Sequence, residues 1–164
     1  MDIRQFYWDF FINAKFSQIY YGLYLEDSYK WMRFINSFLA IASSTSIAAW
    51  VIWNDIPLLW AAIIALSQVI SAIKQYFPFN DRIARLSKMN PLIDTILDDM
   101  ELTWIDISEN KVTDEQIRAC LKECMGRVTK TIDQALAGVD IPARQFFRKT
   151  AQQMAGQYVK TRLM

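Results

Sequence analysis

The stretch that decides the fold of this chain is Phe34–Trp53, FINSFLAIASSTSIAAWVIW, followed almost at once by Ile56–Ile73, IPLLWAAIIALSQVISAI. Neither run contains a charged residue, and only Asn54 and Asp55 separate them. An α-helix rises about 1.5 Å per residue, so each run would reach roughly 27–30 Å, close to the hydrocarbon thickness of a bilayer. Because two residues allow only a tight reversal, the pattern predicts a transmembrane helical hairpin.

Charge divides the rest of the chain. Residues 34–73 carry one charge, whereas most of the 35 charged residues follow residue 79, and the net charge is +1. We therefore expect an all-α membrane protein in three parts: an aromatic-rich amphipathic N-terminal helix (1–29), the transmembrane hairpin (30–79) and a C-terminal cytoplasmic helical bundle with a basic last helix (80–164). The alternative is a helical bundle that buries the central hairpin within protein.

Basic residues near the two runs predict their orientation. Six of them flank the hairpin and none lies in its turn: Lys30, Arg33, Lys74, Arg82, Arg85 and Lys88. Lysine and arginine accumulate on the cytoplasmic side of membrane proteins. The pattern thus places both termini in the cytoplasm and the Asn54–Asp55 turn outside.

Local signals predict where helices begin and end. Asp27-Ser28 is expected to cap the helix that enters the membrane, and Pro91 to interrupt a helix that starts near Asn80. The segment 104–111 is the most loop-like. Thr113–Gln116 fits a capping box, and Gly138 a helix stop. The last helix is expected to start at Pro142.

Polar residues recur within the two apolar runs. The candidates for helix packing or pore lining are Asn36, Ser43, Ser44, Gln68 and Ser71. Together with several alanines they form a small-residue surface, which favours close packing of helices inside the hairpin or between protomers. The alternative is that they line a water-filled pore in an oligomer.

The last helix has a strongly basic composition. It contributes Arg144, Arg148, Lys149, Lys160 and Arg162 and no acidic residue after Asp140. One interpretation is an amphipathic helix packed on its neighbours, with a solvated basic face. The other is contact with anionic lipid headgroups or with an acidic ligand. No nucleic-acid-binding motif accompanies the charge, so no specific nucleic-acid partner is expected.

Catalytic signatures are missing from the sequence. There is no histidine, no Walker loop, no G-x-S-x-G and no HExxH motif. The acidic cluster Asp98, Asp99 and Glu101 is interpreted as a solvated helix face. Cys120 and Cys124 lie on one helix face, as small apolar residues in a helix interface or, alternatively, as a regulatory disulfide or thiol site. We expect a protein that is not an enzyme and uses no metal or cofactor.

The layout resembles the SLATT proteins, two-transmembrane effectors of prokaryotic defence systems linked to nucleotide second messengers. The resemblance lies in four features: the tyrosines from Tyr20 to Tyr29, the opening WMRFIN at 31–36, the near-loopless hairpin, and the exit through ALSQVI (65–70) and YFPFN (76–80). It implies an oligomeric effector in the prokaryotic inner membrane that permeabilises this membrane in an antiphage response. It also implies a cytosolic sensor or a nucleotide second messenger as the trigger.

Three functions fit these observations. The first is the membrane effector just described, a homo-oligomer in contact with the lipid bilayer. The second is a phage holin-like pore former, although the long segment after the second run is unusual for that class. The third is a non-enzymatic membrane scaffold that recruits cytosolic partners.

Overall fold

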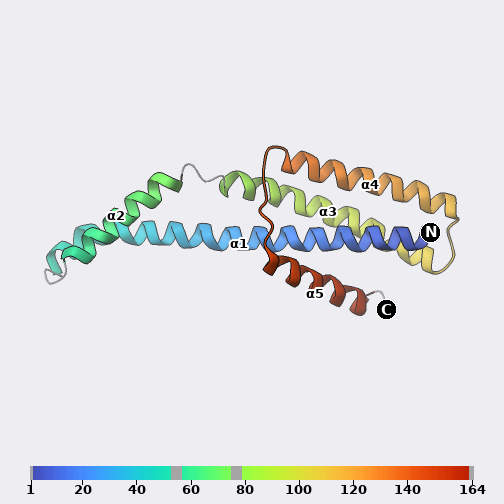
Figure 1. Cartoon of the computed structure of the whole chain (residues 1–164), viewed down its shortest axis with the longest axis horizontal. Coiled ribbons are helices and arrows are strands. Elements are labelled where there is room, and N and C mark those ends of the chain that lie inside the picture. The colour runs from blue at the N-terminus through green and yellow to red at the C-terminus, as the bar shows by residue number, and fades with distance from the viewer. Residues whose placement is uncertain (1, 53–56, 75–78, 163–164) are drawn as a thin grey trace. The chain divides into compact units, whose positions relative to one another are not determined.

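All the secondary structure that the computed structural model describes is α-helical. It describes the backbone of residues 2–52, 57–74 and 79–162, and the side-chain surroundings of these residues except 43–52, 57–60 and 79. Five helices follow one another in this part of the chain (Figure 1): α1 (Ile3–Ile52), α2 (Pro57–Lys74), α3 (Phe79–Ser108), α4 (Asp114–Leu136) and α5 (Gln145–Arg162).

The predicted transmembrane hairpin is not supported. In the described ranges, no helix is both long enough and apolar enough to cross a bilayer. The predictions of a membrane fold, of a multi-pass inner-membrane location and of its orientation are therefore wrong. The predicted Asn54–Asp55 turn lies outside the described residues.

The chain forms two compact units, and α1 contributes to both. Unit 1 contains residues 1–25 and 84–164, and unit 2 contains residues 26–83. The first part of α1, most of α3, and the helices α4 and α5 thus belong to unit 1. The remainder of α1 and all of α2 belong to unit 2.

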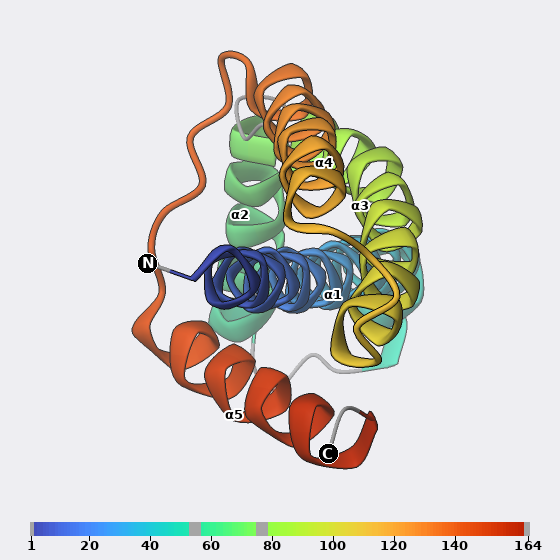
Figure 2. The same ribbon diagram turned by 90° about the vertical axis from the view of Figure 1, so that its right-hand side faces the viewer.

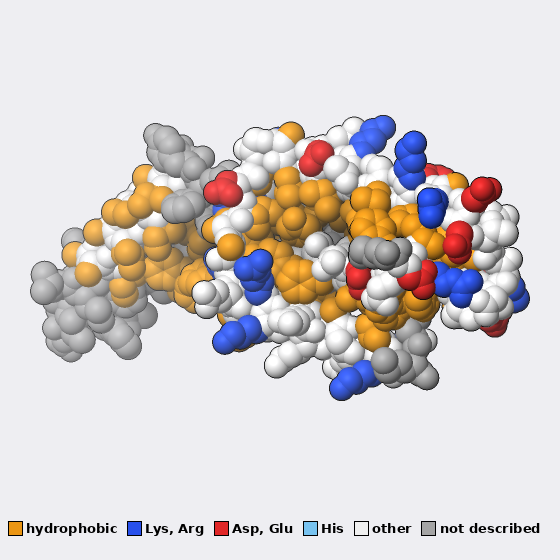
Figure 3. All heavy atoms as spheres, turned by 45° about the vertical axis from the view of Figure 1, so that its right-hand side comes forward, with side chains coloured by type: hydrophobic (Ala, Val, Ile, Leu, Met, Phe, Trp, Pro, Cys, Tyr) orange, Lys and Arg blue, Asp and Glu red, His pale blue; other side chains and the backbone are white. Residues whose placement is uncertain are grey.

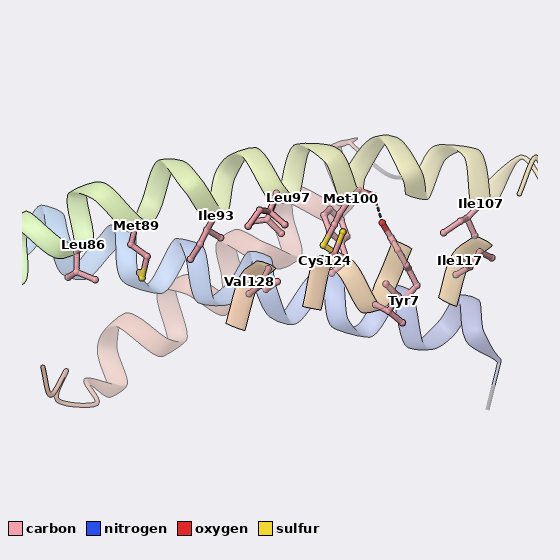
Figure 4. Packing of buried hydrophobic residues seen from close by; sticks show 14 of the residues in the cluster. Tyr7, Leu86, Met89, Ile93, Leu97, Met100, Ile107, Ile117, Cys124 and Val128 are labelled. Carbon is pink, nitrogen blue, oxygen red and sulfur yellow. Dashed lines mark hydrogen bonds between the residues drawn. The ribbon is translucent and has the colours of Figure 1, made fainter. Parts of the chain in front are cut away.

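The core of unit 1 lies between α1, α3 and α4. Along α3, the buried side chains repeat at intervals of three and four residues: Leu86, Met89, Ile93, Leu97 and Met100. They meet Tyr7 and Phe11 from α1 and a matching stripe from α4, namely Ile117, Leu121, Cys124 and Val128 (Figure 4). Such stripes define one apolar face per helix, and burying that face stabilises the bundle. The helices α4 and α5 lie on opposite sides of the N-terminal part of α1 (Figure 2).

Two of the predicted helix boundaries are confirmed. Thr113 caps α4 in a capping box, with the Gln116 amide N–H donating to Thr113 Oγ1 and the Thr113 N–H donating to Gln116 Oε1 at 2.8 Å. The helix α4 ends at Leu136, and Gly138 follows with φ of +72°, a conformation that glycine adopts without a steric penalty.

Three local predictions are wrong because packing overrides the signal. Asp27-Ser28 does not start a helix but lies inside α1, where the Ser28 side chain is buried. Pro91 lies inside α3, between the buried residues Met89 and Ile93 that hold the helix in the core. The segment 104–111 is helical up to Ser108, since the Trp104 ring packs against Trp8 in the N-terminal part of α1.

The start of the last helix also differs from the prediction. The helix α5 begins at Gln145 rather than at Pro142. The Pro142 carbonyl accepts a hydrogen bond from the Tyr20 hydroxyl at 3.4 Å, and the same hydroxyl accepts from the Arg144 N–H at 3.2 Å. These contacts hold the connecting segment against α1 in an extended path before the helix starts.

Candidate functional site

The helix α5 is held against the other helices of unit 1 by a narrow apolar stripe and by one acidic residue of α3. Phe147, Ala151 and Ala155 are buried along the stripe. Near the end of the helix, the Tyr158 hydroxyl donates a short hydrogen bond to Glu101, and Arg162 Nη1 lies 3.6 Å from Glu101 Oε1. Lys15 Nζ lies 4.7 Å from the centre of the Tyr158 ring. Burial raises the pKa of Tyr158, so the hydroxyl stays protonated and able to donate.

An open groove runs between α5 and the N-terminal part of α1. Its volume is about 710 Å³, and its walls are apolar at Ile12, Phe16 and Val159. Polar side chains border it: Asn13 from α1 and Gln145, Arg148, Lys149 and Gln152 from α5. A second hollow of about 450 Å³ shares Phe16 and Arg148 with the first and continues towards Tyr20 and the segment before α5. The two hollows therefore form one elongated surface feature, the α1–α5 groove.

The five basic residues predicted as ligand contacts have different surroundings. Arg144 packs its guanidinium over the rings of Tyr24 and Phe147, 5.5 and 5.3 Å from their centres, and Arg162 pairs with Glu101. Lys160 is exposed near the end of α5. Only Arg148 and Lys149 line the groove. The structure thus brings two of the five together at one surface and uses two others to hold α5 in place.

The polar residues predicted within the apolar runs all belong to unit 2. Asn36 Oδ1 accepts a hydrogen bond from Lys74 Nζ at 2.5 Å, which links α1 to the end of α2. Gln68 and Ser71 are exposed on α2. The side chains of Ser43 and Ser44 lie outside the described residues. The described side chains therefore do not place these five residues together on one pore lining or one helix-packing surface.

Large apolar side chains of unit 2 are exposed instead. On α2, Leu66, Val69 and Ile73 are 52, 52 and 44% exposed, and on α1, Trp31 and Phe34 are 52 and 65% exposed. Hydrophobic side chains gather over the described part of this unit (Figure 3). The two α1 rings form a T-shaped pair with centres 6.1 Å apart. Sequence reasoning identified these side chains as apolar but assigned them to lipid.

Of the two cysteines, Cys124 is buried in the core of unit 1, and Cys120 is partly buried against it. Their sulfur atoms are 4.0 Å apart, and Cys120 Sγ lies 3.8 Å from Thr103 Oγ1. Burial, reinforced by the neighbouring Cys120, raises the pKa of the Cys124 thiol to about 12. A thiol with so high a pKa is a poor nucleophile at neutral pH. The arrangement fits the predicted role of both residues as small apolar groups in a helix interface.

The acidic cluster is dispersed in the structure. Asp99 pairs with Arg127 of α4 at 3.0 Å, Glu101 holds α5, and Asp98 is exposed. Among the residues whose surroundings are described, no group of three or more His, Cys, Asp or Glu side chains is placed to hold a metal ion.

Comparison of the chain with protein-family models, with curated proteins and with solved structures finds no match. The resemblance to the SLATT proteins therefore stays a prediction.

Proposed function

We propose that this chain is a non-enzymatic protein that assembles with further copies of itself through unit 2, while unit 1 acts as a folded binding module. One observation carries the proposal: three of the exposed large apolar side chains of α2, together with Ala62, follow a spacing that suits a second helix. Ala62, Leu66, Val69 and Ile73 follow one another at intervals of four, three and four residues, and all are exposed. Such spacing forms one narrow stripe along a helix, the seam by which helices pair. We call these four residues the α2 stripe.

A second copy is the occupant that fits the α2 stripe best. No charged residue precedes Lys74 in α2, so nothing on this helix selects an acidic or a basic partner. In a twofold dimer each subunit presents the same patch to the other, and an uncharged apolar stripe is complementary to itself. On α1, Trp31, Phe34 and Ile41 are exposed at intervals of three and seven residues and extend the apolar surface of unit 2. Exposed patches of this kind mark interaction sites.

The test is sedimentation velocity of the purified chain over a range of concentrations. The wild type is expected to sediment as an oligomer, and the double variant Leu66→Glu/Val69→Glu as a monomer, because two carboxylates would lie in the seam. Gln68→Glu is the matched control, since Gln68 is exposed on another side of the same helix, and it should leave the oligomer unchanged.

One result would overturn the proposal, namely a wild type that stays monomeric at every concentration. If that monomer floats with lipid vesicles, the stripe faces lipid rather than a second copy. Circular dichroism of each variant confirms that unit 1 is still folded.

A role as an effector that assembles after a signal, which the SLATT resemblance implies, stays a prediction. It requires self-association to depend on a trigger. Sedimentation with and without cyclic nucleotides measures this dependence directly.

A further inference from the structure

The α1–α5 groove combines an apolar interior with two cationic side chains. Ile12, Phe16 and Val159 supply the apolar surface, and Arg148 and Lys149 supply the charge. In the described part of the chain, neither basic side chain forms an ion pair, in contrast to Arg162 on the same helix. The helix α5 itself contains no acidic residue. Among the described residues that line the groove, Asp140 is the only one with a carboxylate, and it borders the smaller hollow.

The shape of the groove favours a polypeptide over a small molecule. It lies open along α5 from Gln145 to Val159, and a helix of that length extends about 21 Å. Small-molecule sites enclose most of their ligand, whereas grooves between helices accept the apolar face of a further helix. The amide side chains Asn13 and Gln152 at the border offer both hydrogen-bond donors and acceptors.

We propose that the α1–α5 groove binds an acidic amphipathic helix of a partner protein. The partner's apolar residues would enter between Ile12, Phe16 and Val159, and its carboxylates would pair with Arg148 and Lys149. Charge complementarity selects this partner, because basic or neutral helices would leave both cations desolvated and unpaired. The site lies in unit 1 and is independent of the α2 stripe.

Gly156 provides a steric probe of the groove. It lines the groove, and a Cβ atom added there would meet no atom within 4 Å beyond the adjoining residues and backbone of its own helix. Gly156→Phe is therefore expected to fill the groove without displacing α5, and replacing a helical glycine also favours the helix. Gly126 of α4 is a matched control, because a Cβ atom there meets equally open space but lies away from the groove.

The experiment selects binders from a display library of random peptides long enough for three helical turns, with the full-length wild type as bait. The enriched peptides are expected to contain aspartate or glutamate together with apolar residues at helical spacing. The affinity of a winning peptide, measured by fluorescence anisotropy, should fall about tenfold or more in Arg148→Glu/Lys149→Glu and in Gly156→Phe. Affinity should be unchanged in Gly126→Phe and in Lys122→Glu/Lys130→Glu, which reverses two exposed charges on α4.

Three outcomes would overturn the proposal: enriched peptides that are not acidic, peptides that bind the groove variants as well as the wild type, or no enrichment at all. Sedimentation of Gly156→Phe provides a further check. If this variant loses self-association while the α2-stripe variant keeps it, the groove binds a second copy rather than a foreign helix. An oligomer lost only in Leu66→Glu/Val69→Glu, with peptide binding intact, supports both proposals separately.

Discussion

Tyr7 shows at the scale of one residue how unit 1 combines apolar packing with a polar contact. Its ring is fully buried between α1 and α3, and its hydroxyl donates a hydrogen bond to the Met100 carbonyl at 3.0 Å. Tyr7→Phe keeps the ring and removes the bond, so we expect it to lower the free energy of unfolding by about 1 kcal/mol. Urea denaturation measures the change. Tyr29→Phe, at an exposed ring, is the control and should change stability little.

Tyrosines that are buried or partly buried also make stability depend on alkaline pH. Desolvation by burial raises the pKa of Tyr7, Tyr21 and Tyr158 above the ordinary value of 10.0. The unfolded chain therefore loses these protons at lower pH than the folded chain does. The stabilisation is complete below pH 10 and is lost as the pH rises through and beyond it. Denaturation between pH 8 and pH 11 should show this decline for the wild type and a shallower one for Tyr7→Phe; equal slopes would contradict the assignment.

Cys124 is predicted to be unreactive in the native protein. Its side chain is buried, and its pKa is raised to about 12, so very little thiolate exists near pH 8. In a Cys120→Ala variant, Cys124 is the only thiol left, and a thiol reagent should modify it only after denaturant is added. Rapid modification in native buffer would show that this part of the core opens readily.

At the scale of the element, the capping box of α4 is expected to contribute measurably to the free energy of unfolding. Thr113→Ala removes the side chain that accepts from the Gln116 N–H, and caps of this type contribute about 1 kcal/mol. Thr129 is exposed within the same helix, where alanine is the better helix former, so Thr129→Ala should be neutral or slightly stabilising. Urea denaturation of the two variants measures both changes in stability. An equal loss of stability in Thr113→Ala and Thr129→Ala would mean that the cap contributes nothing.

The elements differ in how well sequence patterns predict them. Thr113–Gln116 and Gly138 act through neighbours within four residues, so the start and the end of α4 that they predict are found in the fold. Asp27-Ser28 and Pro91 are equally clear signals but lie in helices stabilised by contacts that are distant in sequence. Trp104, for example, packs on Trp8 with ring centres 4.6 Å apart, and this contact extends α3 through a segment that resembles a loop.

At the scale of the whole molecule, sequence patterns identify the two helix faces that line the groove but do not predict that these faces meet. The spacing of Phe10, Asn13 and Phe16 indicates one face of a helix, and the run after Pro142 indicates a basic one. Only the fold places these faces side by side and engages Arg162 elsewhere, leaving Arg148 and Lys149 at the groove. The apolar runs led to the opposite error, since apolar residues favour lipid and protein partners alike, and periodicity alone does not distinguish the two.

Because the chain forms two units, self-assembly should protect one of them selectively. The core of unit 1 is buried within one chain, whereas the α2 stripe is exposed in the single chain and would be covered in the proposed assembly. Hydrogen exchange measured over two orders of magnitude in protein concentration should therefore slow for the amides of residues 61–74 as the concentration rises. Amides of residues 86–100 should not respond, since their protection comes from packing within one chain. In Leu66→Glu/Val69→Glu the concentration dependence should vanish. A change shared equally by both segments would instead mean that association and folding of the whole chain are one event.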